Sequence, residues 1–151
     1  MKVLLTGGAG FIGSHLAAAL LAAGHRVTVV DDMSAGDRSR VPEGASFHRI
    51  DVASDELSAL VAAERPDVID HHAAQISVVA STRDPKADAR TNVLGTLNVL
   101  DCARRHGVRK VIYISSGGAV YGDADVERIP ESWPPAPLSP YAIHKLTGEH
   151  Y

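Results

Sequence analysis

Residues 2–16 read KVLLTGGAGFIGSHL, and this stretch decides the fold. Residues 3–6 have the short apolar run of a buried parallel strand, and an Ala/Leu-rich helix is expected over about 11–23. A glycine turn between such elements leaves backbone N–H groups free at the helix start, where they favour a phosphate. Gly7 suits the tight turn, Gly10 the close approach of a pyrophosphate, and Gly13 the packing of helix on strand. The pattern predicts a dinucleotide-binding turn; a glycine-rich turn without a ligand is the alternative.

Length and composition limit the classes of protein to which this chain can belong. The chain has 151 residues, a formal net charge of −3 and one cysteine, Cys102. The length fits one domain, the mixed charges give no basic stripe for nucleic acid, and a lone cysteine excludes an internal disulfide. The longest apolar segment, 16–23, is too short to span a bilayer, which argues against a membrane protein. Because strand and glycine turn open the sequence, no signal peptide is expected, and we predict a cytoplasmic location.

Strand-like and helix-like segments alternate along the chain. Strands are expected over 26–30, 46–50, 67–70 and 110–115, and helices over 55–64, 85–106 and 140–151. Ser54, Asp84 and Ser139 stand where N-caps of these three helices belong, and Gly24 and Gly107 where helices stop. This alternation predicts one α/β domain, 1–151, built on a doubly wound parallel (Rossmann) sheet of order 3-2-1-4-5.

Acidic residues follow two of the expected strands. Asp31 stands at the end of the second strand, 18 positions after Gly13, where a carboxylate takes the adenosine ribose hydroxyls. A carboxylate there repels a 2′-phosphate and so favours NAD over NADP. Asp51 and Val52 reach the same edge after the third strand. A solvated acid at a strand end is the alternative for Asp31.

Two adjacent histidines, His71 and His72, follow the fourth strand. Neighbours on a strand point to opposite faces, and no further His or Cys stands at ligand spacing, so we expect no metal site. The small residues Ala73 and Ala74 come next and allow the chain to pass close to a flat ligand.

Tyr141 and Lys145 lie one turn apart on the last helix and so share a face. An ammonium near a phenol favours the phenolate and lowers the tyrosine pKa. Such a tyrosine can take a proton from a sugar hydroxyl while a nicotinamide takes the hydride from the same carbon. By itself, a Tyr-x-x-x-Lys pair is usually an ordinary surface pair; the glycine turn and Asp31 make this one a catalytic candidate.

Seven motifs, in order, cover the whole chain: TGGAGFIGSH, VVDD, DV, HHAAQISV, NVLGTLNVL, SSGGAVYG and SPYAIHK. In these the sequence resembles the extended short-chain dehydrogenase/reductases, specifically the NAD-dependent sugar-nucleotide epimerases and dehydratases. The resemblance implies NAD as cofactor and a UDP-sugar or related nucleotide sugar as substrate. It also implies a homodimer formed through helices 85–106 and 141–151.

The resemblance assigns roles to individual residues. Tyr141 is implied as the acid/base, and Lys145 as the group that holds the nicotinamide ribose and tunes Tyr141. The cofactor-binding set is implied to be Gly7, Gly10, Phe11, Ile12, Gly13, Asp31, Asp32, Ser34, Asp51, Val52, Ala73, Ala74, Gln75, Asn92, Ser115, Tyr141 and Lys145.

Residues 116–119 distinguish among the family's activities. Where the dehydratases carry an Asp-Glu pair, this chain has Gly118 and Ala119, which argues against dehydration and favours a 4-epimerase. The catalytic Ser/Thr of the family falls on Gly117, so Ser116 is the candidate for the missing hydroxyl. Family members are two-lobed and about twice as long, and the resemblance covers their cofactor half, without the substrate-binding part. A nucleotide-binding module without turnover, and an NAD-dependent reductase or dehydratase of another substrate, are the alternatives.

Overall fold

A computed structural model describes residues 1–151, in which all five strands join one parallel sheet. The strands are β1 (Lys2–Thr6), β2 (Arg26–Asp31), β3 (Ser46–Arg49), β4 (Val68–His71) and β5 (Lys110–Tyr113). Their order, β3-β2-β1-β4-β5, confirms the predicted doubly wound topology. After β3, at one edge of the sheet, the chain returns to the centre and adds β4 on the other side of β1. The strands β1 and β4 therefore flank the switch point of the sheet, and such sheets bind ligands there, at the carboxyl ends of the strands.

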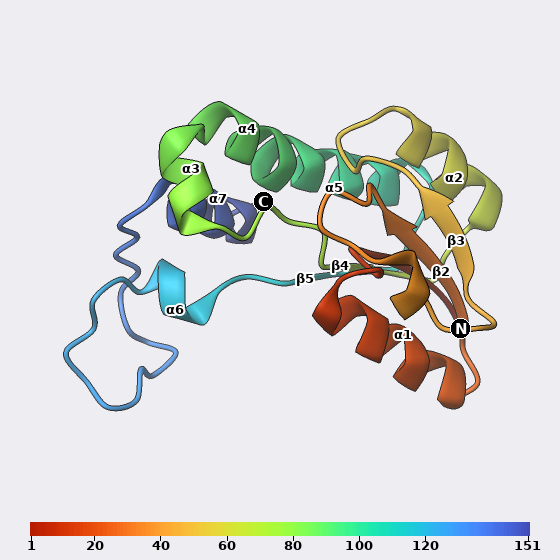
Figure 1. Ribbon diagram of the computed structural model, residues 1–151, viewed down its shortest axis with the longest axis horizontal. Coiled ribbons are helices and arrows are strands. Elements are labelled where there is room, and N and C mark those ends of the chain that lie inside the picture. Colours follow the sequence, from red (N-terminus) through yellow and green to blue (C-terminus); the bar gives the residue numbers. More distant parts are fainter.

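The helical segments connect and cover these strands (Figure 1). They are α1 (Phe11–Ala22), η1 (Arg38–Arg40), α2 (Glu56–Glu64), α3 (Val78–Arg83), α4 (Pro85–Ala89), η2 (Arg90–Gly95), α5 (Thr96–Arg105), α6 (Gly117–Val120) and α7 (Pro140–Glu149). No helix combines the length and the apolar character that crossing a bilayer requires.

Two apolar cores lie on opposite faces of the sheet. Leu4 packs with α2 and α5 on one face, while its neighbour Leu5 packs with α1 on the other. Val30 and Val29 divide between the faces in the same way. Figure 1 shows α1 on one side of the sheet and α2 with α5 on the other. The near-continuous burial of β1 and β2 is what a parallel sheet covered on both faces requires.

Two of the three predicted helix N-caps are confirmed, and one is wrong. Asp84 accepts from the Ala87 N–H, and Ser139 accepts from the Ala142 N–H, as expected. The prediction for Ser54 was wrong: its hydroxyl is buried without a hydrogen-bond partner, and α2 begins after Asp55. The helix predicted over 85–106 is not uniform, because a π-helical turn, η2, separates α4 from α5.

Two short α-helices were not predicted. The helix α3 begins after Ser77, whose hydroxyl accepts from the Ala80 N–H. The four-residue α6 directly follows Ser116, where the chain leaves β5. Both α3 and α6 pack against α7. Segments for which no helix was predicted therefore surround the last helix.

The helix α7 lies beyond the strand ends, beside α3 and α4 (Figure 1). It meets the sheet through Tyr113, the last residue of β5, whose phenol donates to the carbonyl oxygen of Lys145 at 3.1 Å. Gly148 sits directly against the same ring, and a Cβ at Gly148 would clash with the phenol oxygen. A side chain at this position would therefore push α7 away from the sheet.

The contact between Gly148 and Tyr113 gives a stability prediction. Although alanine is the better helix former, Gly148→Ala should lower the free energy of unfolding by about 1–3 kcal/mol, because the ring and its bond to α7 must shift. Gly117→Ala is the matched control, since a Cβ there meets open space, and it should change stability by less than about 0.5 kcal/mol. Urea unfolding measures both; equal midpoints for the two variants would contradict the prediction.

Candidate functional site

The glycine turn after β1 is closed against the loop that follows β4. Gly7 has a φ of +67°, and a Cβ there would lie 2.7 Å from the backbone nitrogen of Ala73. A Cβ at Gly13 would clash with the carbonyl oxygen of Gly7. A Cβ at Gly10 meets only that same oxygen, at 3.2 Å. Gly7 and Gly13 are thus demanded by the fold itself, whereas Gly10 is compatible with a small side chain in the fold alone.

The start of α1 is open. Its N-cap, Gly10, provides no side-chain cap, and the first turn carries no acid. The side chains of Phe11 and Ile12 are exposed, at 72% and 63%. A helix start without a side-chain cap or an acid leaves its amides and its dipole available to an anion, as a pyrophosphate site requires.

Asp31 ends β2 with its carboxylate buried beside the glycine turn. One oxygen accepts from the Ala9 N–H at 3.0 Å and the other from the Met33 N–H at 2.9 Å. These two bonds fix the carboxylate at the carboxyl edge of the sheet, where it was predicted to stand. Asp32 and Ser34 form an exposed turn of their own, in which Asp32 accepts from both the N–H and the hydroxyl of Ser34.

Asp51 and Val52 follow β3 with different surroundings. Asp51 pairs with Arg90 at 2.5 Å and accepts from the Ala53 N–H. Partial burial raises the pKa of Asp51, but these hydrogen bonds outweigh it, and the pKa lies below its usual value. The side chain of Val52 is buried in the core, against Gly95 of η2, so it is the backbone of Val52 that borders the edge.

His71 links the sheet to Thr96, the first residue of α5. The Thr96 hydroxyl donates to the carbonyl oxygen of Asn92. Its oxygen therefore accepts a hydrogen bond from the Nε2–H of His71, 3.1 Å away. The other ring nitrogen, Nδ1, therefore accepts from the Thr6 hydroxyl at 2.7 Å, and Thr6 in turn accepts from the Ala73 N–H. Burial, with the nearby charge of Lys145, lowers the pKa of His71 to about 3. His71 is thus a neutral structural residue with a defined tautomer.

The loop after β4 is bonded to α4 and η2. The backbone N–H of Gln75 donates to Asn92 Oδ1, and Asn92 Nδ2 donates back to the Gln75 carbonyl oxygen. The Gln75 amide nitrogen donates to Asp88 at 2.5 Å. Ala73 and Ala74 are half-buried just before it. The side chains of Gln75 and Asn92 thus hold this loop in place, in addition to any role toward a ligand.

Tyr141 and Lys145 are both buried on α7, with 8% and 5% of their surface exposed. Lys145 Nζ lies 4.6 Å from the ring centroid of Tyr113, a cation–π contact. Burial lowers the pKa of Lys145 to about 8, although the charges of Asp88 and Glu149 act in the opposite direction. Burial, with the charge of Glu149, raises the pKa of Tyr113 to about 12, so this phenol remains a hydrogen-bond donor.

The serines after β5 differ in their contacts. The hydroxyl of Ser115 donates to the carboxylate of Glu149 on α7. Ser116 is the N-cap of α6, but its hydroxyl makes no capping bond. Gly117 begins α6 and faces open space. The hydroxyl of Ser116 is therefore not committed to capping the helix that it precedes.

The predicted residues thus gather at one edge, in two groups. The glycine turn, Asp31 and the loop at Ala73 form one group, and Tyr141 with Lys145 forms the other. His71 lies between them, with its ring centroid 6.0 Å from that of Tyr113. Asp32, Ser34 and Asp51 lie farther out, at the ends of β2 and β3.

Three residues of this arrangement were missed from sequence: Asp88, Tyr113 and His144. Asp88 stands four positions before Asn92, a spacing that places the two on one helical face. His144 stands between Tyr141 and Lys145, and Tyr113 ends a predicted strand at the edge where the site was expected. These local signals were available, but nothing in the sequence connected Asp88 with His144 across 56 positions.

The profile of the NAD dependent epimerase/dehydratase family matches residues 3–151. The chain belongs to this family. Among its relatives, the UDP-glucose 4-epimerase of Mycolicibacterium smegmatis is 45% identical over 156 residues, which cover 100% of this chain and 50% of the relative.

Solved structures agree with this assignment. The Thermus thermophilus UDP-glucose 4-epimerase in complex with NAD is 47% identical with a TM-score of 0.97, covering 100% of this chain and 49% of that one. The Thermotoga maritima UDP-glucose 4-epimerase with UDP-glucose is 41% identical, also with a TM-score of 0.97, covering 100% and 50%. The chain spans about half the length of the relatives that it matches.

The buried ammonium of Lys145 lowers the stability of the folded chain. Because its pKa is about 8 in the folded chain and 10.5 as a free group, the unfolded state binds the proton more tightly. Lys145→Met should therefore raise the free energy of unfolding at pH 7 by about 1–3 kcal/mol. The gain should shrink as the pH rises from 8 to 10.5, where the native lysine loses its charge. Urea unfolding at several pH values measures this; a destabilised variant at pH 7 would contradict it.

Proposed function

We propose that residues 1–151 form the NAD-binding and catalytic domain of a UDP-glucose 4-epimerase. The observation that carries the proposal is that buried Lys145 and Tyr141 share one sheet edge with an open glycine turn. His71 joins the two groups, since it is bonded to Thr6 beside the turn and lies against Tyr113 below Lys145. The UDP-glucose 4-epimerases of M. smegmatis and T. thermophilus, each similar over the whole chain, support the choice of reaction.

The residues at the edge fit NAD. The open start of α1 suits the pyrophosphate, and the carboxylate of Asp31, fixed by backbone amides, suits two ribose hydroxyls. We assign Asp32, Ser34, Asp51 and Val52 to the adenosine end, and Ala73, Ala74, Gln75, Asn92 and Ser115 to the middle and the nicotinamide end. The fit requires that no side chain replace Gly10.

The chemistry divides between NAD and the chain. Bound NAD would supply the hydride acceptor for the sugar C4 and the hydride donor for its return. Tyr141 takes the proton of the O4 hydroxyl as the hydride leaves, and gives it back on return. The Lys145 ammonium stabilises the phenolate form of Tyr141. The side chain of Tyr113 holds Lys145 from below, through its ring and through its bond to the helix backbone.

Ser116 is proposed to supply the hydroxyl that Gly117 lacks. Its side chain makes no cap bond to α6, and it stands three residues after the end of β5, one position before the family's Ser/Thr. A hydroxyl beside Tyr141 can hold the same sugar oxygen by a second hydrogen bond.

We also propose a homodimer. Leu94 of η2 and Ile143 of α7 are exposed at 57% and 49%, on neighbouring helices that pack against each other. Apolar side chains on such a surface suit a partner helix pair. The cytoplasmic location stays a prediction from the sequence.

Binding of NAD can be separated from folding at two glycines. Gly10→Ala should leave the free energy of unfolding within about 1 kcal/mol of the parent but weaken NAD binding at least tenfold, because the methyl group occupies space meant for the pyrophosphate. Gly13→Ala should lower both, since its Cβ clashes with the backbone. Calorimetric titration of the 151-residue chain with NAD, beside urea unfolding, measures the pair. Unchanged NAD affinity in Gly10→Ala would contradict the assignment.

Catalysis can be tested at Tyr141. In the protein as its source cells make it, Tyr141→Phe should lower kcat for the conversion of UDP-galactose to UDP-glucose by about 10²–10⁴-fold, the usual contribution of a general acid/base. NAD affinity should change little, since the ring remains. Epimerisation at the parent rate in Tyr141→Phe would refute the mechanism.

A second candidate is an NAD-binding protein without turnover, favoured by the absence of a hydroxyl at Gly117. Measurable NAD binding without conversion of UDP-galactose by the native protein would select it. Conversion of another substrate in a screen would instead select a reductase or dehydratase.

A further inference from the structure

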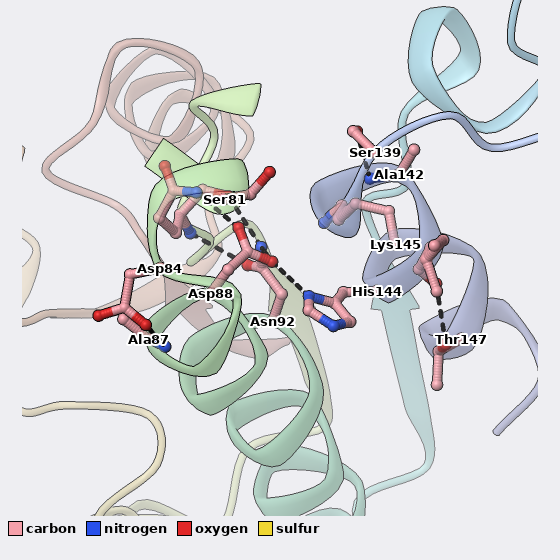
Figure 2. Close-up of polar contacts among 12 residues, drawn as sticks. Ser81, Asp84, Ala87, Asp88, Asn92, Ser139, Ala142, His144, Lys145 and Thr147 are labelled. Carbon is pink, nitrogen blue, oxygen red and sulfur yellow. Dashed lines mark hydrogen bonds and ion pairs between the residues drawn. The ribbon is translucent and has the colours of Figure 1, made fainter. Parts of the chain in front are cut away.

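Asp88 is a carboxylate buried at 1% exposure outside the proposed chemical centre. Its Oδ1 accepts from Gln75 at 2.5 Å, and its Oδ2 accepts from Asn92 at 3.1 Å and from His144 Nδ1 at 2.5 Å. Figure 2 shows the His144 ring turned toward this carboxylate across the gap between α7 and α4. Among these three donors, only His144 can carry a positive charge, and only His144 comes from α7.

The attachment of α7 explains the importance of this contact. Besides Asp88–His144, the side-chain hydrogen bonds of α7 to other elements are Tyr113 to the Lys145 carbonyl and Ser115 to Glu149. Both of these come from the end of β5. Asp88, on α4, holds the helix from another direction, because the side chains of His144 and Glu149, five positions apart, are turned by about 140° from each other around the helix axis. Two attachments at different angles fix the rotation of a helix, which one attachment leaves free.

Rotation of α7 decides where the two proposed catalytic side chains point. Tyr141 and Lys145 flank His144 on either side along the helix, so any turn of α7 carries all three together. The charge of Asp88 also acts directly, since it favours the ammonium form of Lys145 and limits how far burial lowers its pKa.

We propose that His144 is a positioning residue, which sets the rotation of α7 through its bond to buried Asp88 and so places Tyr141 and Lys145 against the cofactor edge. This inference rests on the proposed function, because it concerns the same two side chains. It adds a residue that touches neither substrate nor cofactor and acts from the α4 side of the helix.

The test compares side chains of different reach at position 144. His144→Ala removes the bond. His144→Asn places an amide nitrogen where Nδ1 stands, so it keeps the bond. Thr147→Ala is the matched control on the same helix, because the Thr147 hydroxyl bonds only to the Ile143 carbonyl within α7 (Figure 2).

Two readouts are measured on the 151-residue chain. The first is the NMR shift of the Lys145 side-chain methylene next to Nζ, which the Tyr113 ring displaces upfield and which reports the place of α7 without any ligand. The second is NAD affinity. His144→Ala should lose most of the upfield displacement and bind NAD about tenfold more weakly, because α7 would then hold the rotation that binds NAD only about one tenth of the time. His144→Asn should keep both the Lys145 shift and the NAD affinity of the parent chain, and Thr147→Ala should change neither.

The outcomes separate the two ideas. If His144→Ala lowers stability but has the same Lys145 shift and the same NAD affinity as the control Thr147→Ala, the bond only stabilises the packing of α7. That result would overturn the positioning role. If no variant and no parent protein binds NAD, the proposed function fails, while the Lys145 shift still decides whether His144 positions α7. Should His144→Ala not fold, His144→Gln takes its place, since its amide reaches the Nε2 position and not that of Nδ1.

Discussion

The arrangement depends on the close approach of two backbone segments, the turn at Gly7 and the chain at Ala73. They meet where β1 and β4 end side by side, with no room for a Cβ between them. The hydroxyl of Thr6 spans the junction, because it accepts from Ala73 and donates to His71. The pairing of parallel strands thus brings the glycine turn and the loop at Ala73 to one place, and one side-chain hydroxyl connects them.

From that junction, hydrogen bonds continue to the last helix through the buried side chains of Asn92 and Asp88 and the half-buried ring of His144. Asn92 ties the loop to η2, and Asp88 ties η2 and α4 to α7. Such a network is stable only when every member has its partners, because an orphaned polar group costs about 1–3 kcal/mol. Lys145 is the exception: its ammonium is buried with a cation–π contact and two carboxylates at a distance. The chain keeps a destabilising charge where the proposed chemistry uses one.

Sequence patterns predicted the sheet order and the cofactor edge because local rules decide them. Glycine spacing, strand length and the caps at Asp84 and Ser139 each depend on a few neighbouring residues. The π-helical turn and the contact of His144 with Asp88 depend on how α4 and α7 meet after folding, and no local pattern encodes such a meeting. The cap predicted at Ser54 failed for a related reason, since the preferred residue was present but the helix began one residue later. The roles of single residues toward NAD stay predictions that rest on the family resemblance.

The π-helical turn has an evolutionary consequence. The segment Arg90–Gly95 holds one more residue than an α-helical path between the same points would need. Loss of a single residue here would restore a regular helix between the same end points, so the segments on either side would keep their relative orientation. Asp88 would still face His144, and Thr96 with the rest of α5 would keep its place in the core. This turn is therefore a point at which related chains can lose one residue without detaching the last helix from α4.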